Sequence, residues 1–134
     1  MSVAVDTNVL VRLLVKDDPH QFAAARKLVE DAEAAGEPLL VMLGALLETE
    51  WVLRSRYKLD KVSIAGAFAA MLESAGVQFE HEPTVEEALH LWAQHPRSDF
   101  SDCLLAARAA HLGRDRFLTF DVRAARLPRA ELLR

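Results

Sequence analysis

Acidic residues follow the apolar segments of this chain, where α/β proteins usually place their ligand-binding side chains. Asp6 follows the apolar run of residues 3–5, and Asp121 follows a similar run that ends in Thr119 and Phe120. At the carboxyl edge of a parallel sheet, ligands bind and helices begin. Each aspartate is therefore either a ligand for a metal or substrate, or an ordinary helix N-cap, for which Asp is among the preferred residues.

Asp99 and Asp102 are three residues apart at the start of a predicted helix, so they share one of its faces. Leu105 and Ala106 continue that face, which predicts that Asp102 points toward the core. The alternative is a capping box, with Asp99 as the N-cap and Asp102 in place of the usual Glu or Gln. This segment alone leaves both interpretations open.

Glu48 and Glu50 belong to one predicted helix, and we expect them to differ. Glu50 has Arg54 four residues later, the favoured orientation for an exposed ion pair on a helix. Glu48 has Gly44 behind it and Val52 ahead, so it is predicted to face inward from a small, apolar surface. An acid on such a face indicates a binding partner or a functional role, because carboxylates are almost never buried without a partner.

Short apolar segments alternate with segments of helical periodicity along the whole chain. Strands are predicted at residues 3–5, 39–43, 77–81 and 116–120, with an edge strand at 131–133. Helical segments are predicted at residues 9–15, 19–35, 44–57, 61–74, 85–94, 99–112 and 122–127. This alternation predicts a three-layer α/β/α sandwich with a central, mainly parallel sheet of four to five strands.

Length and composition narrow the class of protein. A chain of 134 residues predicts one domain over residues 1–134. No apolar run approaches the roughly 18 residues of a membrane span, and no signal-peptide pattern is present, so we expect a cytoplasmic protein. The single cysteine, Cys103, excludes a disulfide framework and a cysteine zinc site within one chain. The net charge of −4 argues weakly against a nucleic-acid partner. This argument is weaker still if several acids converge on one metal site, because bound cations would offset their charge locally.

The parallel topology can bring four acids to one edge of the sheet: Asp6, Glu48, Asp102 and Asp121. Clustered carboxylates raise one another's pKa unless cations are present, and ligands that are all oxygen select Mg²⁺ or Mn²⁺. Two such ions stabilise in-line attack on a phosphodiester. The histidines show no paired metal spacing, and neither a glycine-rich phosphate loop nor a serine nucleophile elbow occurs. The predicted chemistry is metal-assisted hydrolysis.

Four segments of the sequence resemble the PIN-domain ribonucleases, in particular the VapC-type toxins of type II toxin–antitoxin pairs. They read VAVDTNVLVRLL, LLETEWVLRSRY, SDFSDCLLAARAAHLG and FLTFD, and together they cover essentially the whole chain. The resemblance implies an α/β/α fold and a Mg²⁺- or Mn²⁺-dependent nuclease. It assigns the metal-binding and catalytic acids to Asp6, Glu48, Asp102 and Asp121, with Asp99 auxiliary. Glu50 departs from the pattern, which usually has an apolar residue there.

The resemblance also implies partners. The target would be structured RNA, tRNA or rRNA, whose cleavage inhibits translation. The protein would be a homodimer, blocked by a small antitoxin that wraps it. Several basic side chains are candidates for contacts with RNA phosphates, although a solvated surface explains them equally well: Arg12, Arg54, Arg56, Lys58 and Arg97.

Two other classes of function remain. A Mg²⁺-dependent phosphatase-like or phosphate-receiving domain also uses acids at strand ends, but it needs a second acid beside Asp6 or a lysine at a late strand end, and neither is present. A catalytically silent PIN-like binding module needs none of the four acids. A nuclease assay with and without EDTA separates these three possibilities.

Overall fold

The computed structural model describes residues 2–134, which form two compact units. The first unit ends at Glu80 and the second spans His81–Arg134. Within residues 2–134, no helix is both long enough and apolar enough to cross a membrane. The prediction of one domain over residues 1–134 stays a prediction.

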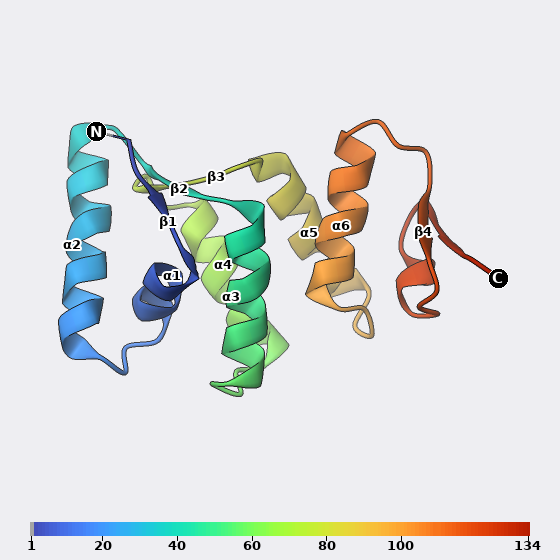
Figure 1. Ribbon diagram of the computed structural model, residues 1–134, viewed down its shortest axis with the longest axis horizontal. Helices are drawn as coiled ribbons and strands as arrows, with labels where there is room; N and C mark the ends of the chain where they lie inside the picture. Colours follow the sequence, from blue (N-terminus) through green and yellow to red (C-terminus); the bar gives the residue numbers. More distant parts are fainter. Residues whose placement is uncertain (1) are drawn as a thin grey trace. The chain divides into compact units, whose positions relative to one another are not determined.

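A three-stranded parallel sheet organises the first unit (Figure 1). Its strands are β1 (Ala4–Val5), β2 (Leu39–Val41) and β3 (Val77–Phe79), in the order β1-β2-β3. Val5 pairs with Val41, and Val41 pairs with Phe79, so buried apolar side chains run across the sheet. Asp6 follows the last residue of β1, as the sequence predicts.

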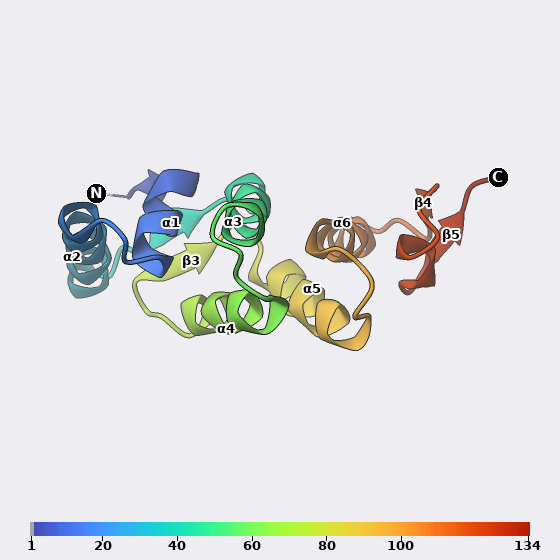
Figure 2. The same cartoon turned by 90° about the horizontal axis from the view of Figure 1, so that it is seen from below.

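Four helices complete the first unit: α1 (Thr7–Leu14), α2 (Pro19–Ala35), α3 (Leu43–Ser55) and α4 (Lys61–Leu72). The ends of α2 agree with the sequence pattern. The Asp18 side chain accepts a hydrogen bond from the Gln21 amide at 3.0 Å, and Gly36 adopts the left-handed conformation that ends the helix. α1 packs against α2 and α3, and α4 lies beside β3 (Figure 2).

The second unit pairs α5 (Glu82–Gln94) with α6 (Phe100–His111), followed by β4 (Phe117–Thr119), a 3₁₀ turn (Ala124–Arg126) and β5 (Ala130–Leu132). β4 and β5 run parallel and pair with each other. The Trp92 and Phe100 rings pack with centroids 5.0 Å apart, and Cys103 is fully buried as a packing residue.

The predicted α/β class with parallel strands is confirmed, and every predicted strand has its counterpart. Over residues 2–134, five strands form a three-stranded sheet and a two-stranded sheet, whereas the sequence predicts one central sheet of four to five strands. An apolar run indicates that a strand is buried but not which strand lies beside it, because that partner is chosen by contacts far apart in the chain.

Candidate active site

Asp6 is the N-cap of α1. Its backbone is extended, at φ −94° and ψ −179°, and its Oδ1 accepts a hydrogen bond from the Val9 amide at 3.1 Å. The side chain is exposed. An ionised carboxylate has acceptor sites on both oxygens, so this cap leaves Oδ2 available to a ligand. The capping interpretation of Asp6 is therefore confirmed without excluding the ligand interpretation.

The predicted orientations of Glu48 and Glu50 are wrong. Glu48 is exposed, whereas the Glu50 side chain is only 5% exposed. Glu50 lies one turn from the fully buried Leu46, so the buried stripe of α3 passes through it. Its predicted partner is correct, because Arg54 Nε donates to Glu50 Oε2 at 2.8 Å. The pair is thus buried at the acid and half exposed at the arginine.

Glu48 lines a hollow of about 630 Å³ between α1 and α3, which we call the α1–α3 hollow. The Glu48 carboxylate is thus open to solvent but lies in a concave surface, where a bound ligand contacts several side chains at once. The other lining residues come from α1, α3 and the segment after α3: Thr7, Asn8, Val11, Arg12, Gly44, Leu47, Trp51, Val52, Arg56 and Tyr57.

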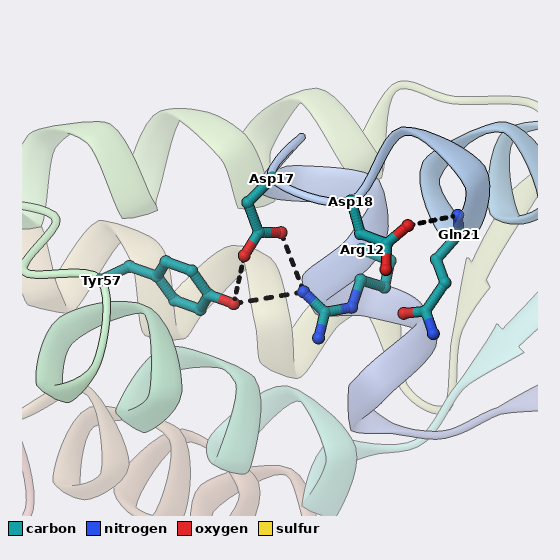
Figure 3. A network of polar contacts seen from close by, with 5 residues as sticks. All are labelled: Arg12, Asp17, Asp18, Gln21 and Tyr57. Carbon is teal, nitrogen blue, oxygen red and sulfur yellow. Dashed lines mark hydrogen bonds and ion pairs between the residues drawn. The ribbon is translucent and has the colours of Figure 1, made fainter.

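A three-residue network holds Arg12 at the α1–α3 hollow (Figure 3). Arg12 Nη1 donates to Asp17 Oδ1 at 2.8 Å and to the Tyr57 hydroxyl at 3.3 Å, and that hydroxyl donates to Asp17 Oδ2 at 3.0 Å. The hydrogen bond with Tyr57 raises the pKa of Arg12. Some loss of hydration opposes ionisation of the exposed Asp17 side chain, but hydrogen bonds from Tyr57 and Arg12 outweigh it and lower the pKa of Asp17. Sequence reasoning missed this network because Arg12 and Tyr57 are 45 residues apart.

Asp102 lies in the first turn of α6, within the second unit, and is partly buried. Burial raises its pKa, and the negative charges of Asp99 and Asp121 raise it further, against the opposing charge of Arg123. The charges of Asp99 and Asp121 thus both act on Asp102, whereas the predicted convergence of Asp6, Glu48, Asp102 and Asp121 stays a prediction. All three belong to the second unit.

Asp99 is the N-cap residue of α6, but its side chain makes no capping hydrogen bond. The capping-box interpretation of Asp99 and Asp102 therefore lacks its first bond. The predicted inward face is only partly correct, since Ala106 is buried but Leu105 is 49% exposed. Asp102, which is partly buried, therefore lies between the buried side and the exposed side of α6.

Asp121 is held by backbone amides at the end of β4. Its Oδ1 accepts from Arg123 N at 2.7 Å and from Ala124 N at 3.1 Å, and its Oδ2 lies 3.6 Å from Arg123 Nη2. These bonds, the Ala124 amide first, lower the pKa of Asp121. The side chain is therefore anionic and fixed in direction, as a cation ligand requires.

Comparison with known proteins identifies the family. The family model of the PIN domain matches residues 3–130. The chain belongs to the PIN-domain family. A VapC ribonuclease of Aquifex aeolicus (strain VF5) is 24% identical over 123 residues, which cover 92% of this chain and 90% of that protein. Mycobacterium tuberculosis VapC20, described as a Sarcin-Ricin loop cleaving toxin, is a structural neighbour at a TM-score of 0.43 and 23% identity, covering 94% of this chain and 96% of that one.

The donor set of this PIN domain suits a hard divalent cation. Its second unit offers carboxylate oxygens from Asp99, Asp102 and Asp121; burial first, and then the charges of the two other aspartates, raise the pKa of Asp102. Across residues 2–134, no three His, Cys, Asp or Glu side chains form a group that could hold a metal ion. The assignment of Asp6, Glu48, Asp102 and Asp121 as ligands thus stays a prediction.

The PIN domain also contains a histidine network that sequence reasoning missed. The buried Thr84 hydroxyl lies 2.8 Å from His81 Nδ1 and 2.9 Å from His111 Nδ1, and His111 Nε2 lies 3.1 Å from Glu87 Oε2. The Thr84 amide also donates to His81 Nδ1, so His81 caps α5, which begins at Glu82, three residues before its predicted start. These bonds join α5 to α6. The spacing of 27 residues between Thr84 and His111 gives no local signal.

Proposed function

We propose that this PIN domain is a Mg²⁺- or Mn²⁺-dependent endoribonuclease that hydrolyses RNA phosphodiester bonds. Asp6, Glu48, Asp102 and Asp121 are its metal-binding and catalytic acids, and Asp99 is auxiliary. The observation that carries the proposal is the placement of acids at the start of α6 and just after β4, where Asp102 is partly buried and the negative charges of Asp99 and Asp121 act on it, opposed by Arg123. Membership of the PIN family and the similarity to a protein named VapC ribonuclease support the same activity.

The four acids would have different roles in hydrolysis. Asp6, Asp102 and Asp121 supply anionic oxygens for the cation, and two backbone amides fix the direction of Asp121. Glu48 serves as a further ligand or accepts a hydrogen bond from the attacking water, which its exposed position in the α1–α3 hollow permits. When bound, the divalent cation would lower the pKa of water and offset charge on the phosphate.

We further propose that the protein is the toxin of a toxin–antitoxin pair and inhibits translation by cleaving structured RNA, tRNA or rRNA. Its partners would be a cognate antitoxin and a second copy of the chain in a homodimer. The name of the similar protein from Aquifex aeolicus, VapC ribonuclease, supports this proposal. A cytoplasmic location agrees with such a target.

The test is RNA cleavage by the purified protein with Mg²⁺, with Mn²⁺ and with excess EDTA. We expect cleavage that needs the metal and leaves a 5′-phosphate. Full activity in EDTA would contradict the proposal. Hydrolysis of a phosphomonoester without RNA cleavage would indicate the phosphatase-like alternative, and no hydrolysis of either substrate would indicate a silent binding module.

A further inference from the structure

Trp51 is a large aromatic side chain that the first unit leaves uncovered. It is 53% exposed, whereas Trp92 in the second unit is 4% exposed and packs against Phe100. Trp51 does not stand on a flat surface, because it lines the α1–α3 hollow beside Glu48. An exposed indole in a concave, charged site is suited to stacking on a flat ligand such as a nucleic-acid base.

Arg12 places a positioned cation in the same hollow. Asp17 and Tyr57 hold its Nη1, which limits the conformations of a side chain that would otherwise be mobile (Figure 3). Within the described residues, the hydrogen bonds of Arg12 use Nη1, so the Nε and Nη2 groups still offer donors. A guanidinium held in this way binds phosphate oxygens with less loss of entropy than a free side chain.

Gly44 leaves the wall of the hollow open next to Glu48. It lies four residues before Glu48 on α3, and both residues line the hollow. A Cβ added at Gly44 would meet nothing within 4 Å, and its φ is not in the left-handed range, so neither packing nor backbone conformation requires glycine there. Since glycine within a helix is less stable than alanine, a ligand that approaches the helix closely accounts for it better.

We propose that the α1–α3 hollow is a subsite for one nucleotide of single-stranded RNA, in which Trp51 stacks on the base and Arg12 contacts a phosphate. The subsite rests on the proposed ribonuclease function, because it would hold a nucleotide next to the scissile bond at Glu48. The volume of about 630 Å³ suits one ligand of that size. The lining of the hollow also matches the two parts of a nucleotide, since the exposed indole of Trp51 suits a base, and Arg12 and Arg56 suit a phosphate.

The experiment measures the affinity of the full-length protein for a short, fluorescein-labelled single-stranded RNA of mixed sequence, by anisotropy in EDTA. Trp51→Ala should weaken binding by about tenfold, and Trp51→Phe should restore most of the loss because an aromatic face remains. Arg12→Gln should weaken binding and reduce the salt dependence by about one phosphate contact. Gly44→Leu, which fills the hollow, should weaken binding without lowering the Tm.

Matched controls on α2 and α4 separate the subsite from general surface effects. Arg26→Gln removes the same charge as Arg12→Gln, from an arginine that is likewise paired with an acid, Glu30. Val62→Ala removes an apolar side chain that is 80% exposed. Both should bind RNA as the unmodified protein does. In a Trp92→Phe background, RNA should quench the fluorescence of Trp51, which reports stacking directly.

Equal affinities for the unmodified protein, Trp51→Ala and Arg12→Gln would overturn the subsite. So would a Trp51→Ala protein that changes its oligomeric state in light scattering but keeps its RNA affinity, because Trp51 would then contact a second copy. The subsite and the ribonuclease proposal fail separately. If Trp51→Ala and Arg12→Gln weaken RNA binding but the unmodified protein never cleaves RNA, the subsite is supported and the nuclease proposal is contradicted. If the unmodified protein cleaves RNA with a divalent metal but the two variants bind RNA as it does, the nuclease proposal is supported and the subsite is contradicted.

Discussion

Two polar clusters of this molecule contain the same kinds of groups in different proportions. In the first unit, Arg12, Asp17 and the Tyr57 hydroxyl form a closed triangle in which one cation faces one carboxylate. In the second unit, the charges of Asp99 and Asp121 act on Asp102, Arg123 opposes them and also pairs with Asp121, and the pKa of Asp102 is raised. The pKa of Asp17 is lowered in the first cluster, whereas in the second cluster the pKa of Asp102 is raised, by burial first, and the pKa of Asp121 is lowered by backbone amides. Burial and local charge together therefore distinguish the balanced cluster, in which Asp17 holds the Arg12 side chain in position, from the unbalanced cluster around Asp102, in which negative charges are in excess.

The largest effect is expected from breaking the unbalanced cluster. Asp102→Asn should reduce RNA cleavage by about 100-fold or more, since changes even at the outer partners of a metal site cost about 10- to 100-fold. Asp31→Asn is the matched control, because Asp31 is an exposed acid paired with Lys27 on α2. Initial rates in Mg²⁺ measure both variants. Cleavage by Asp102→Asn at half the rate of the control would remove Asp102 from the site.

The next effect is on stability. Metal that binds only the native state should stabilise the protein by about 2.7 kcal/mol at a hundredfold excess over its dissociation constant. Asp102→Asn should lose most of this gain. A carboxyl whose folded pKa is raised loses stability as the pH rises through its unfolded pKa, so the metal-free variant should be at least as stable as the unmodified protein at neutral pH.

Thermal melts in EDTA and in Mn²⁺ measure both parts of this prediction. An undiminished shift with Mn²⁺ in Asp102→Asn would show that the cation binds elsewhere. A lower melting temperature of the metal-free variant would instead support a capping role for Asp102, since loss of a capping group destabilises a helix.

A smaller effect should separate the two glutamates of α3. Glu50→Ala should destabilise the protein by about 2 kcal/mol, because it removes a charged hydrogen-bond partner from Arg54 at a buried position. Glu48→Gln should change the free energy of unfolding by less than about 0.5 kcal/mol, as expected of an exposed side chain, and should abolish cleavage. Urea unfolding and RNA cleavage test the pair. Equal destabilisation by the two changes would mean that α3 is rotated from its described orientation.

The smallest expected effect concerns the balanced cluster. The folded pKa of Asp17 is below its ordinary value of 3.8, so its contribution to stability is present above that pH and is lost as the pH falls below it. Asp17→Asn lacks this contribution. The melting temperature of the unmodified protein should therefore fall more steeply on acidification below pH 3.8 than that of Asp17→Asn. Parallel curves would show that the triangle with Arg12 and Tyr57 does not form in solution.

Local signals in the sequence predicted much of the fold. Asp18, Pro19 and Gly36 mark the ends of α2 correctly, because capping depends on residues only a few positions apart. The positions of Asp6 and Asp121 after β1 and β4 were also readable, since each follows a short apolar run. The rotation of α3 was misjudged because the flanks of Glu48 are as apolar as those of Glu50. The side of the helix that faces the core depends on where the neighbouring elements pack.

The sequence by itself determined the secondary structure, the parallel α/β class and the acids available for a cation, since these follow from short-range periodicity and residue type. Only the tertiary structure decided that Glu50 is buried and Glu48 is exposed, that Arg12 meets Tyr57, and that Thr84 joins His81 to His111. These contacts link residues on different elements or select one face of a helix. Such choices minimise the free energy of the whole packed unit, and no local pattern of residues specifies them.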